Sequence, residues 1–326
     1  MKGNRGRRRV RVVAGDEPLV SSAGASLLIE AARATGADRE LSRALRPWRR
    51  RRAEHDPGKV LLDVALAIAL GGDCLADLGV VRAQPDLFGV VASDPTVSRL
   101  IDTLADDAEA SVTAIRTARA AARAAAWSHR SPVSGDGPVI VDLDATIVLA
   151  HSEKEGATPT FKRTFGFHPL LAFVDHGTEG TGEPLAALLR EGRSNANDAA
   201  DQIAVLDAAI AQLPDAVRGR VLLRGDTGSG VQGLLHHVTG LGLNYSVGVY
   251  GRQPVLDALT ATPRCAWRSA IDSDGNPRDG AQVAEITRYL PANRHRSGNW
   301  RTVLGSDRSD RRWNRARRRR RVDHHL

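Results

Sequence analysis

The stretch Val139–Ala150, VIVDLDATIVLA, constrains the fold of this chain more than any other. Its apolar side chains form an almost continuous run, which is typical of a β-strand covered on both faces. Side chains alternate along a strand, so Asp142 and Asp144 are expected on one face. Two buried like charges destabilise a fold unless a cation or hydrogen bonds offset them. The stretch therefore predicts a divalent-metal site, because hard cations prefer carboxylate oxygens. The alternative is a pair of aspartates held by backbone amides.

The positive charge of the chain is concentrated at its ends. The 326 residues carry a net charge of +8, and Arg294–Leu326 alone holds twelve arginines against three aspartates. The basicity therefore belongs to this segment and to Lys2–Arg11, and not to the folded body. The two cysteines lie far apart in no metal-ligand spacing, which fits a reducing cytoplasm. The longest apolar run, Val60–Leu70, is too short to cross a bilayer, so no membrane partner is expected.

Residues 19–128 read as an all-α domain that follows a flexible basic arm at residues 1–18. Cap residues, prolines and apolar periodicity predict helices at Ser26–Thr35, Arg39–Leu45, Asp56–Leu70, Cys74–Gly79, from Pro95 onward and at Ile101–Trp127. The linker Ser128–Gly137 that follows is the clearest domain boundary in the chain.

Two segments of this region are candidate DNA contacts. One is an arginine run after Trp48, which is either a phosphate-binding element or a solvated loop: Arg49, Arg50, Arg51 and Arg52. The other resembles the second helix of a helix-turn-helix, in which Thr96, Ser98 and Arg99 would face DNA. The alternative for this segment is an ordinary helix of an all-α domain.

Residues 138–250 read as an α/β domain with a mixed sheet. After the first strand, further strands are expected at Phe165–Val174, Pro184–Leu189, Val221–Leu223 and Leu243–Val249, and helices at Asn197–Leu213 and Val231–Thr239. If the first and fourth strands are neighbours, Asp144 and Asp226 meet at one edge of the sheet. Two carboxylates there are suited to a shared metal that serves phosphodiester chemistry.

The segment from Val139 to Tyr250 resembles the RNase H-like catalytic domain of bacterial insertion-sequence DDE transposases. The resemblance is carried by VDLDAT, FGFHPLLAF, EGRSNAND and LLRGDTGSG. It implies an RNase H-like mixed sheet with flanking helices, preceded by the all-α domain and followed by a partial β-rich insertion. It also implies Mg²⁺ or Mn²⁺ held by Asp144 and Asp226, with Asp142 as a further candidate ligand.

The same resemblance implies the biology of the chain. Its partners would be DNA, namely the terminal repeats of the element and the target DNA, and it would act as a homodimer on DNA. Its activity would be metal-dependent DNA strand cleavage and transfer. Its location would be the cytoplasm of a bacterium, in association with the nucleoid.

The carboxyl end departs from the family pattern. The third acidic residue of the family is a glutamate on a helix after the β-rich insertion. In this chain residues 251–291 read as the start of such an insertion, built of loops and turns, and they contain the last glutamate, Glu285. Residues 292–326 read as an Arg-rich, disordered tail. The sequence therefore predicts a truncated or frame-shifted transposase that lacks its third ligand, and the alternative is a natural basic tail that binds DNA.

Two other functions remain open from the sequence. A haloacid-dehalogenase-type phosphatase would use Asp142 and Asp144, because residues 142–146 match D-x-D-x-T literally. Against it, no second acidic residue follows Asp226 within its turn. A non-catalytic DNA-binding remnant would bind the same DNA with a steep salt dependence and leave it uncut.

Overall fold

The structure, a computed structural model, describes residues 24–129, 136–177, 182–272, 274–290 and 303–307. The predicted basic arm and most of the predicted tail lie outside these residues. The chain divides into two compact units. The first contains the described residues up to Arg193 together with Ile203–Leu222. The second contains Ser194–Gln202 together with the described residues from Leu223 onward.

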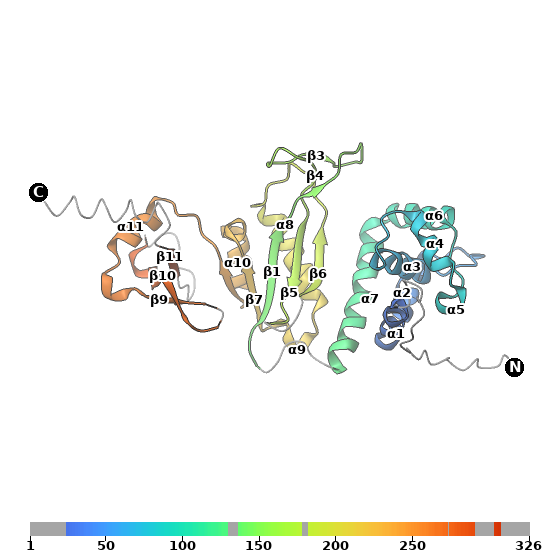
Figure 1. The fold of residues 1–326 in the computed structure, drawn as a ribbon, viewed down its shortest axis with the longest axis horizontal. Helices are drawn as coiled ribbons and strands as arrows, with labels where there is room; N and C mark the ends of the chain where they lie inside the picture. Colours follow the sequence, from blue (N-terminus) through green and yellow to red (C-terminus); the bar gives the residue numbers. More distant parts are fainter. Residues whose placement is uncertain (1–23, 130–135, 178–181, 273, 291–302, 308–326) are drawn as a thin grey trace, which may run out of the picture. The chain divides into compact units, whose positions relative to one another are not determined.

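The first unit begins with the predicted all-α region (Figure 1). The α-helices are α1 Ala25–Thr35, α2 Ala37–Ala44, α3 Pro57–Ala69, α4 Leu78–Arg82, α5 Pro85–Phe88, α6 Asp94–Ala105 and α7 Ala108–His129, with 3-10 turns η1 Arg46–Trp48 and η2 Leu75–Asp77. The predicted start of α3 is confirmed, because the Asp56 carboxylate accepts the N–H of Lys59 at 3.1 Å. Phe88, Leu78 and Val97 are buried in the core of this region.

The prediction of one long helix over Ile101–Trp127 is wrong. The chain leaves the helix after Ala105 and begins α7 at Ala108. Asp106 and Asp107 stand at the break, and aspartate is a weak helix former because its side chain competes for backbone hydrogen bonds. The hydroxyl of Ser111 donates to the carbonyl of Leu104 at 2.9 Å and fixes the break.

The predicted mixed α/β sheet is present. Its strand order is β6-β5-β1-β7-β8, with bounds β1 Val139–Ala145, β5 Leu170–Val174, β6 Glu183–Leu188, β7 Val221–Gly225 and β8 Asn244–Val247. The strand β5 pairs antiparallel with both β1 and β6. The N–H of Val139 donates to the carbonyl of Arg220 at 2.9 Å, so β1 and β7 begin at the same edge. The expectation that the first and fourth strands are neighbours is confirmed.

Two predicted strands are each divided between two sheets. The run Val139–Ala150 forms β1 and then β2 Val148–Leu149, and the run Phe165–Val174 forms β4 Phe165–Phe167 and then β5. With β3 Thr158–Pro159, the strands β2 and β4 make a separate sheet of order β2-β4-β3. Pro169 stands between β4 and β5 and has no N–H for a continuous ladder.

The helices of the α/β region are α8 Ala199–Gln212, α9 Asp215–Arg218 and α10 Gln232–Gly240, with the 3-10 turn η3 Thr227–Ser229. The division between the units passes through α8 and β7. The second unit continues with α11 Gln253–Ala261, η4 Arg264–Ala266, β9 Arg268–Ile271, β10 Pro277–Glu285, η5 Thr287–Tyr289 and β11 Val303–Asp307. The strands β11-β10-β9 form one antiparallel sheet.

This second unit corrects two expectations. The segment 251–291 was expected to hold loops and turns, but α11 is a helix that begins at Gln253 and has Pro254 in its first turn. The strand β11 falls inside the segment expected to be a disordered tail, and it pairs with β10. No helix in the described part of the chain is long and apolar enough to cross a membrane.

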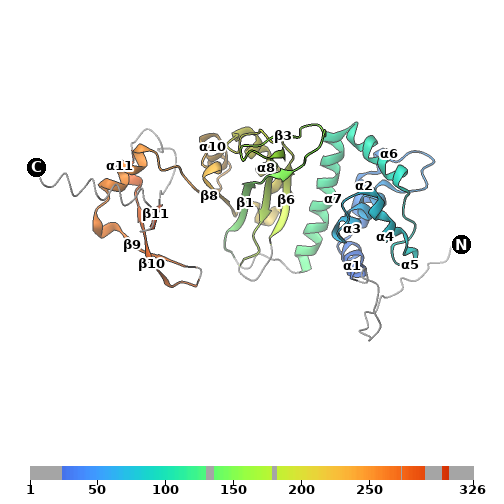
Figure 2. The same cartoon turned by 45° about the horizontal axis from the view of Figure 1, so that its top comes forward.

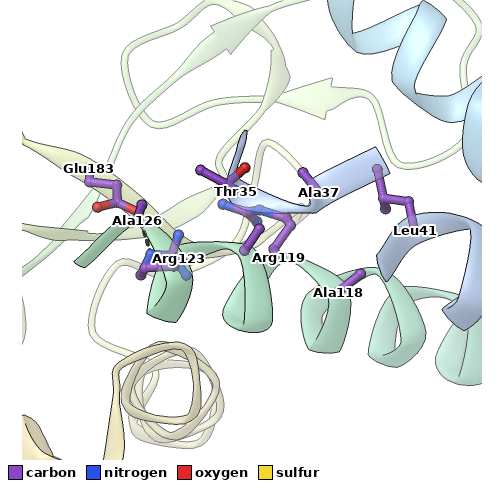
Figure 3. Close-up of a pocket in the computed structure, with 9 residues that line it drawn as sticks. Thr35, Ala37, Leu41, Ala118, Arg119, Arg123, Ala126 and Glu183 are labelled. Atoms are coloured by element: carbon purple, nitrogen blue, oxygen red, sulfur yellow. Dashed lines mark hydrogen bonds and ion pairs between the residues drawn. The ribbon is translucent and has the colours of Figure 1, made fainter. Parts of the chain in front are cut away.

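Within the first unit, α7 runs beside the edge strand β6 (Figure 2). Arginines of α7 fasten the helix to this strand. Arg123 is buried and pairs with the carboxylate of Glu183, and it also donates to the side chain of Gln212 at 3.0 Å. Arg119 donates to the carbonyl of Pro184 at 2.9 Å. Figure 3 shows Arg119 and Arg123 on α7, with Arg123 pointing toward Glu183. The fastening joins the helical region to the sheet.

Replacing Arg123 with alanine should destabilise the fold by about 3–5 kcal/mol, because it leaves a half-buried carboxylate without its cation. The change is measured by chemical denaturation followed by circular dichroism. The control is Arg116→Ala, which removes a neighbouring arginine whose side chain donates to the carbonyl of Ala187 at 3.2 Å. The control should lose about 1 kcal/mol or less. Equal losses in the two variants would contradict a special role for Arg123.

Candidate active site

The first pair of carboxylates lies on β1. Alternation along this strand puts Asp142 and Asp144 on one face, as predicted. The strand is not covered on both faces, however, because Asp142 is half-buried and Asp144 is exposed. The Oδ1 atom of Asp144 accepts the N–H of Ala145 at 2.8 Å. The destabilisation expected from burying a charge therefore does not apply to Asp144. Asp144 remains a candidate metal ligand because it stands near the end of β1 and because hard cations prefer carboxylate oxygens.

Asp226 immediately follows β7 and is exposed. Its Oδ1 atom accepts the N–H of Gly228 at 2.7 Å, which fixes the direction of the carboxylate. The loop is tight, since a Cβ on Gly248 would lie 2.8 Å from the backbone nitrogen of Thr227. Asp226 is thus held by the backbone of a constrained turn.

A residue that sequence reasoning did not single out supports this turn. Gln202 on α8 is only 1% exposed. Its Nε2 donates to the carbonyl of Ala196 at 2.8 Å and to that of Gly228 at 3.0 Å. It ties the EGRSNAND segment to the turn that carries Asp226. Gln202 lies at helical spacing from the buried residues Val205, Leu206 and Ala209. A glutamine on this apolar face is the sequence signal that could have indicated it.

The chemistry of these donors fits a hard divalent cation. Asp144 and Asp226 each use Oδ1 for a backbone amide. Among the described residues, no hydrogen bond to either Oδ2 is formed. Exposed carboxylate oxygens of this kind are the ligands that Mg²⁺ and Mn²⁺ prefer. Asp144 belongs to the first unit and Asp226 to the second, and their joint coordination of a metal stays a prediction.

A different cluster has the geometry of metal ligands but is explained by a turn. Asp73, Cys74 and Asp77 are the only three such residues that lie together in the described ranges. The Oδ2 of Asp77 accepts the N–H of Cys74 at 3.0 Å and that of Asp73 at 2.9 Å. These hydrogen bonds, that from Cys74 first, lower the pKa of Asp77. The cluster is a cap at the start of η2, and it carries no sign of a ligand.

The two candidate DNA segments are both accessible. Arg50, Arg51 and Arg52 are exposed in the loop after η1, and Arg49 lies 3.7 Å from the carboxylate of Asp56. On α6, Ser98 and Arg99 are exposed and Thr96 is half-buried, while Val97 faces the core. Arg99 donates to the hydroxyl of Thr96 at 3.1 Å. DNA contact by either segment stays a prediction.

The transposases that the sequence resembles have a third acidic ligand, a glutamate on a helix after the β-rich insertion. No described helix of this chain carries a counterpart after β8. Glu285 is exposed at the end of β10, where it pairs with Val303 of β11. It is also the last glutamate of the sequence. The expected position of Glu285 in the β-rich segment is therefore confirmed.

A cavity of about 250 Å³ lies elsewhere in the first unit. Its lining is partly shown in Figure 3 and comes from α1, α2, α7 and Glu183. Its acidic residue, Glu183, is already paired with Arg123. The cavity is therefore unsuited to a metal and separate from the carboxylates on β1.

The comparison with known families agrees with the fold. The family described as "Transposase DDE domain group 1" matches residues 2–318, which is nearly the whole chain. The match includes the all-α region, both units and most of the Arg-rich segment. No curated protein matches the sequence.

Proposed function

Because the chain belongs to the transposase DDE domain family, we propose that it serves an insertion sequence, binding DNA at the element ends and holding divalent metal at Asp144 and Asp226. When bound, the metal, Mg²⁺ or Mn²⁺, would activate an attacking oxygen and stabilise the leaving oxygen in DNA strand cleavage and transfer. This chain should not complete that reaction, because no described helix after β8 supplies a glutamate as third acidic ligand. Asp142 is a further candidate ligand. The chain acts as a homodimer on DNA.

The observation that carries this proposal is the pairing order of the sheet. β1 and β7 are neighbours that begin at the same edge. Asp144 is the penultimate residue of β1, and Asp226 is the first residue after β7. A shared metal with one carboxylate after each of these strands requires this strand order, so the order supports the proposal. The phosphatase alternative receives no support from the family match.

Both carboxylates should be required for metal binding, which should be weak in the absence of DNA. Two carboxylates leave most of the coordination shell to water, which hard cations tolerate but which limits affinity. The measurement is a Mn²⁺ titration followed by electron paramagnetic resonance. Asp144→Asn and Asp226→Asn should each abolish the bound fraction, and Asp142→Asn reports whether that residue contributes.

Asp175 supplies a matched control. Its Oδ1 accepts the N–H of Gly177 at 2.7 Å, the same contact and distance as between Asp226 and Gly228. It lies beside the start of β1, where its N–H donates to the carbonyl of Ile140. Asp175→Asn should therefore leave Mn²⁺ binding unchanged. Tight binding that survives Asp226→Asn would overturn the proposed site.

A non-catalytic DNA-binding role is the second candidate, and one observation favours it. Among the described residues, no helix after β8 carries a glutamate that could accompany Asp144 and Asp226. A chain of this kind would bind the element ends and metal but would not complete the chemistry.

A further inference from the structure

An arm projects from the sheet at the edge where β1 ends. Adjacent antiparallel strands need only a short turn to connect them, yet β1 and β5 are joined by the whole segment Thr146–Pro169. This segment, termed the arm, forms the small sheet β2-β4-β3. Figure 1 shows β3 and β4 beyond the ends of β1 and β5. The arm is therefore an addition beside the candidate active site that the sheet itself does not require.

The arm is held rigidly. Gly166 has φ 152°, and a Cβ there would collide with the carbonyl of Val148. A Cβ on Gly192 would collide with the carbonyl of Thr158, so the EGR segment packs directly on the arm. At the base, the N–H of His168 donates to the carbonyl of Arg190 at 3.0 Å, and Arg190 Nε returns a hydrogen bond of 3.0 Å to the His168 carbonyl. Close backbone packing of this kind fixes where the tip points.

The tip presents an aromatic ring and two cations. The N–H of Thr160 donates to the carbonyl of Thr164 at 2.8 Å, and their hydroxyls lie 2.7 Å apart, which closes the loop. Phe161, Lys162 and Arg163 stand between them, and all three are exposed. Phe161 is 69% exposed. Arg163 has φ 61°, the only positive φ of a non-glycine residue in the described ranges.

The position of the Phe161 ring relative to the end of β1 follows from its contact with His168. Its centroid is 5.5 Å from that of His168, which is buried. Leu171 pairs with Asp144 across the two strands, and His168 lies three residues before Leu171. Three residues of strand span about 10 Å, so the ring lies on the order of 15 Å from Asp144. Each strand of duplex DNA advances about 3.4 Å along the helix axis per nucleotide, so this distance corresponds to four or five nucleotides of duplex.

We propose that the tip of the arm binds the DNA strand about four or five nucleotides from the scissile phosphate. Phe161 stacks on a base that has left the duplex, and Lys162 and Arg163 lie against the flanking phosphates. The proposal rests on the proposed function, because it takes the DNA at Asp144 as given. The two cations favour an anionic partner over a second copy of the chain. Stacking accepts any base, so the contact is independent of sequence.

The test compares two DNA probes by fluorescence anisotropy. One is a blunt duplex, and the other is the same duplex with a single-stranded overhang. Binding is measured in EDTA, so that metal at Asp144 and Asp226 plays no part. The wild type should prefer the overhang. Phe161→Ala should lose that preference by about five- to a hundredfold, which is the usual contribution of one stacked base.

Three further variants separate the possible causes. Phe161→Tyr keeps the ring and should keep the preference. Tyr250→Ala removes an aromatic residue that is 52% exposed in the second unit, and it should have no effect. The double variant Lys162→Gln with Arg163→Gln should weaken both probes and flatten the salt dependence. Circular dichroism verifies that each variant is folded.

The outcomes distinguish this inference from the proposed function. If the wild type binds neither probe, the proposed DNA-binding function fails. If it binds DNA but Phe161→Ala binds the overhang equally well, the arm is not a DNA contact. A change in self-association measured by sedimentation, without a change in DNA binding, would assign Phe161 to an interface between copies of the chain and overturn the inference.

Discussion

Supplied with DNA that carries the terminal repeats of its element and with Mg²⁺ or Mn²⁺, the 326-residue chain should give no excision and no strand transfer. The reaction requires the attacking and leaving oxygens to be clamped between two ions, and two ions need more ligand charge than Asp144 and Asp226 provide. Loss of this positioning and charge stabilisation typically lowers a rate by a factor of about 100 or more. Asp142 lies on the same strand as Asp144 and cannot close the site from the opposite side.

The assay also tests Glu285 directly. Robust excision that Glu285→Gln abolishes would show that the third ligand comes from the end of β10. Asp279→Asn is the matched control, because Asp279 is an exposed carboxylate on the same strand. If that variant retains activity while Glu285→Gln does not, the prediction of an incomplete site is wrong.

Removing residues 308–326 should weaken binding to random duplex DNA by orders of magnitude. The segment holds nine arginines against two aspartates. Each phosphate contact contributes about 0.9 to the slope of log affinity against log salt concentration, so the slope should fall by several units. The truncation point after Asp307 keeps β11, which pairs with β10. The measurement is a binding titration at several salt concentrations.

Two variants control for charge and for location. Replacing Arg317–Arg321 with lysines keeps the charge and should keep the slope. Replacing Arg49–Arg52 with serines tests the other arginine run. If the truncated chain binds as well as the full chain, and the serine variant does not, the helical region carries the nonspecific contacts.

The sequence identified those helices and strands whose ends are marked by cap residues or prolines close by in the chain. Asp56 and Pro57 mark the start of α3, and Pro214 follows the end of α8 closely. The order of predicted strands allowed the first and fourth to be neighbours, and β1 and β7 are neighbours in the structure. The break at Asp106 and the helix α11 were missed, because propensity and proline position are weak against tertiary packing.

The remaining misses concern long-range pairing. An apolar run such as Val139–Ala150 reports burial, but it does not report which sheet each residue joins. Gln202 could not be assigned, because its partners Ala196 and Gly228 meet only in the folded chain. The exposure of Phe161 depends on the closed loop between Thr160 and Thr164. The sequence could not indicate this exposure, because a phenylalanine is more often buried in a core.

The arginines of α7 have a consequence for solubility. β6 is an edge strand, and an uncovered edge presents carbonyl and N–H groups on which another chain can add a strand. Arg119 and Arg123 both donate to the carbonyl of Pro184, and proline offers no N–H of its own. The helix thereby shields this edge against intermolecular β-pairing. A fragment that began after α7, made to isolate the sheet, would uncover the edge and aggregate.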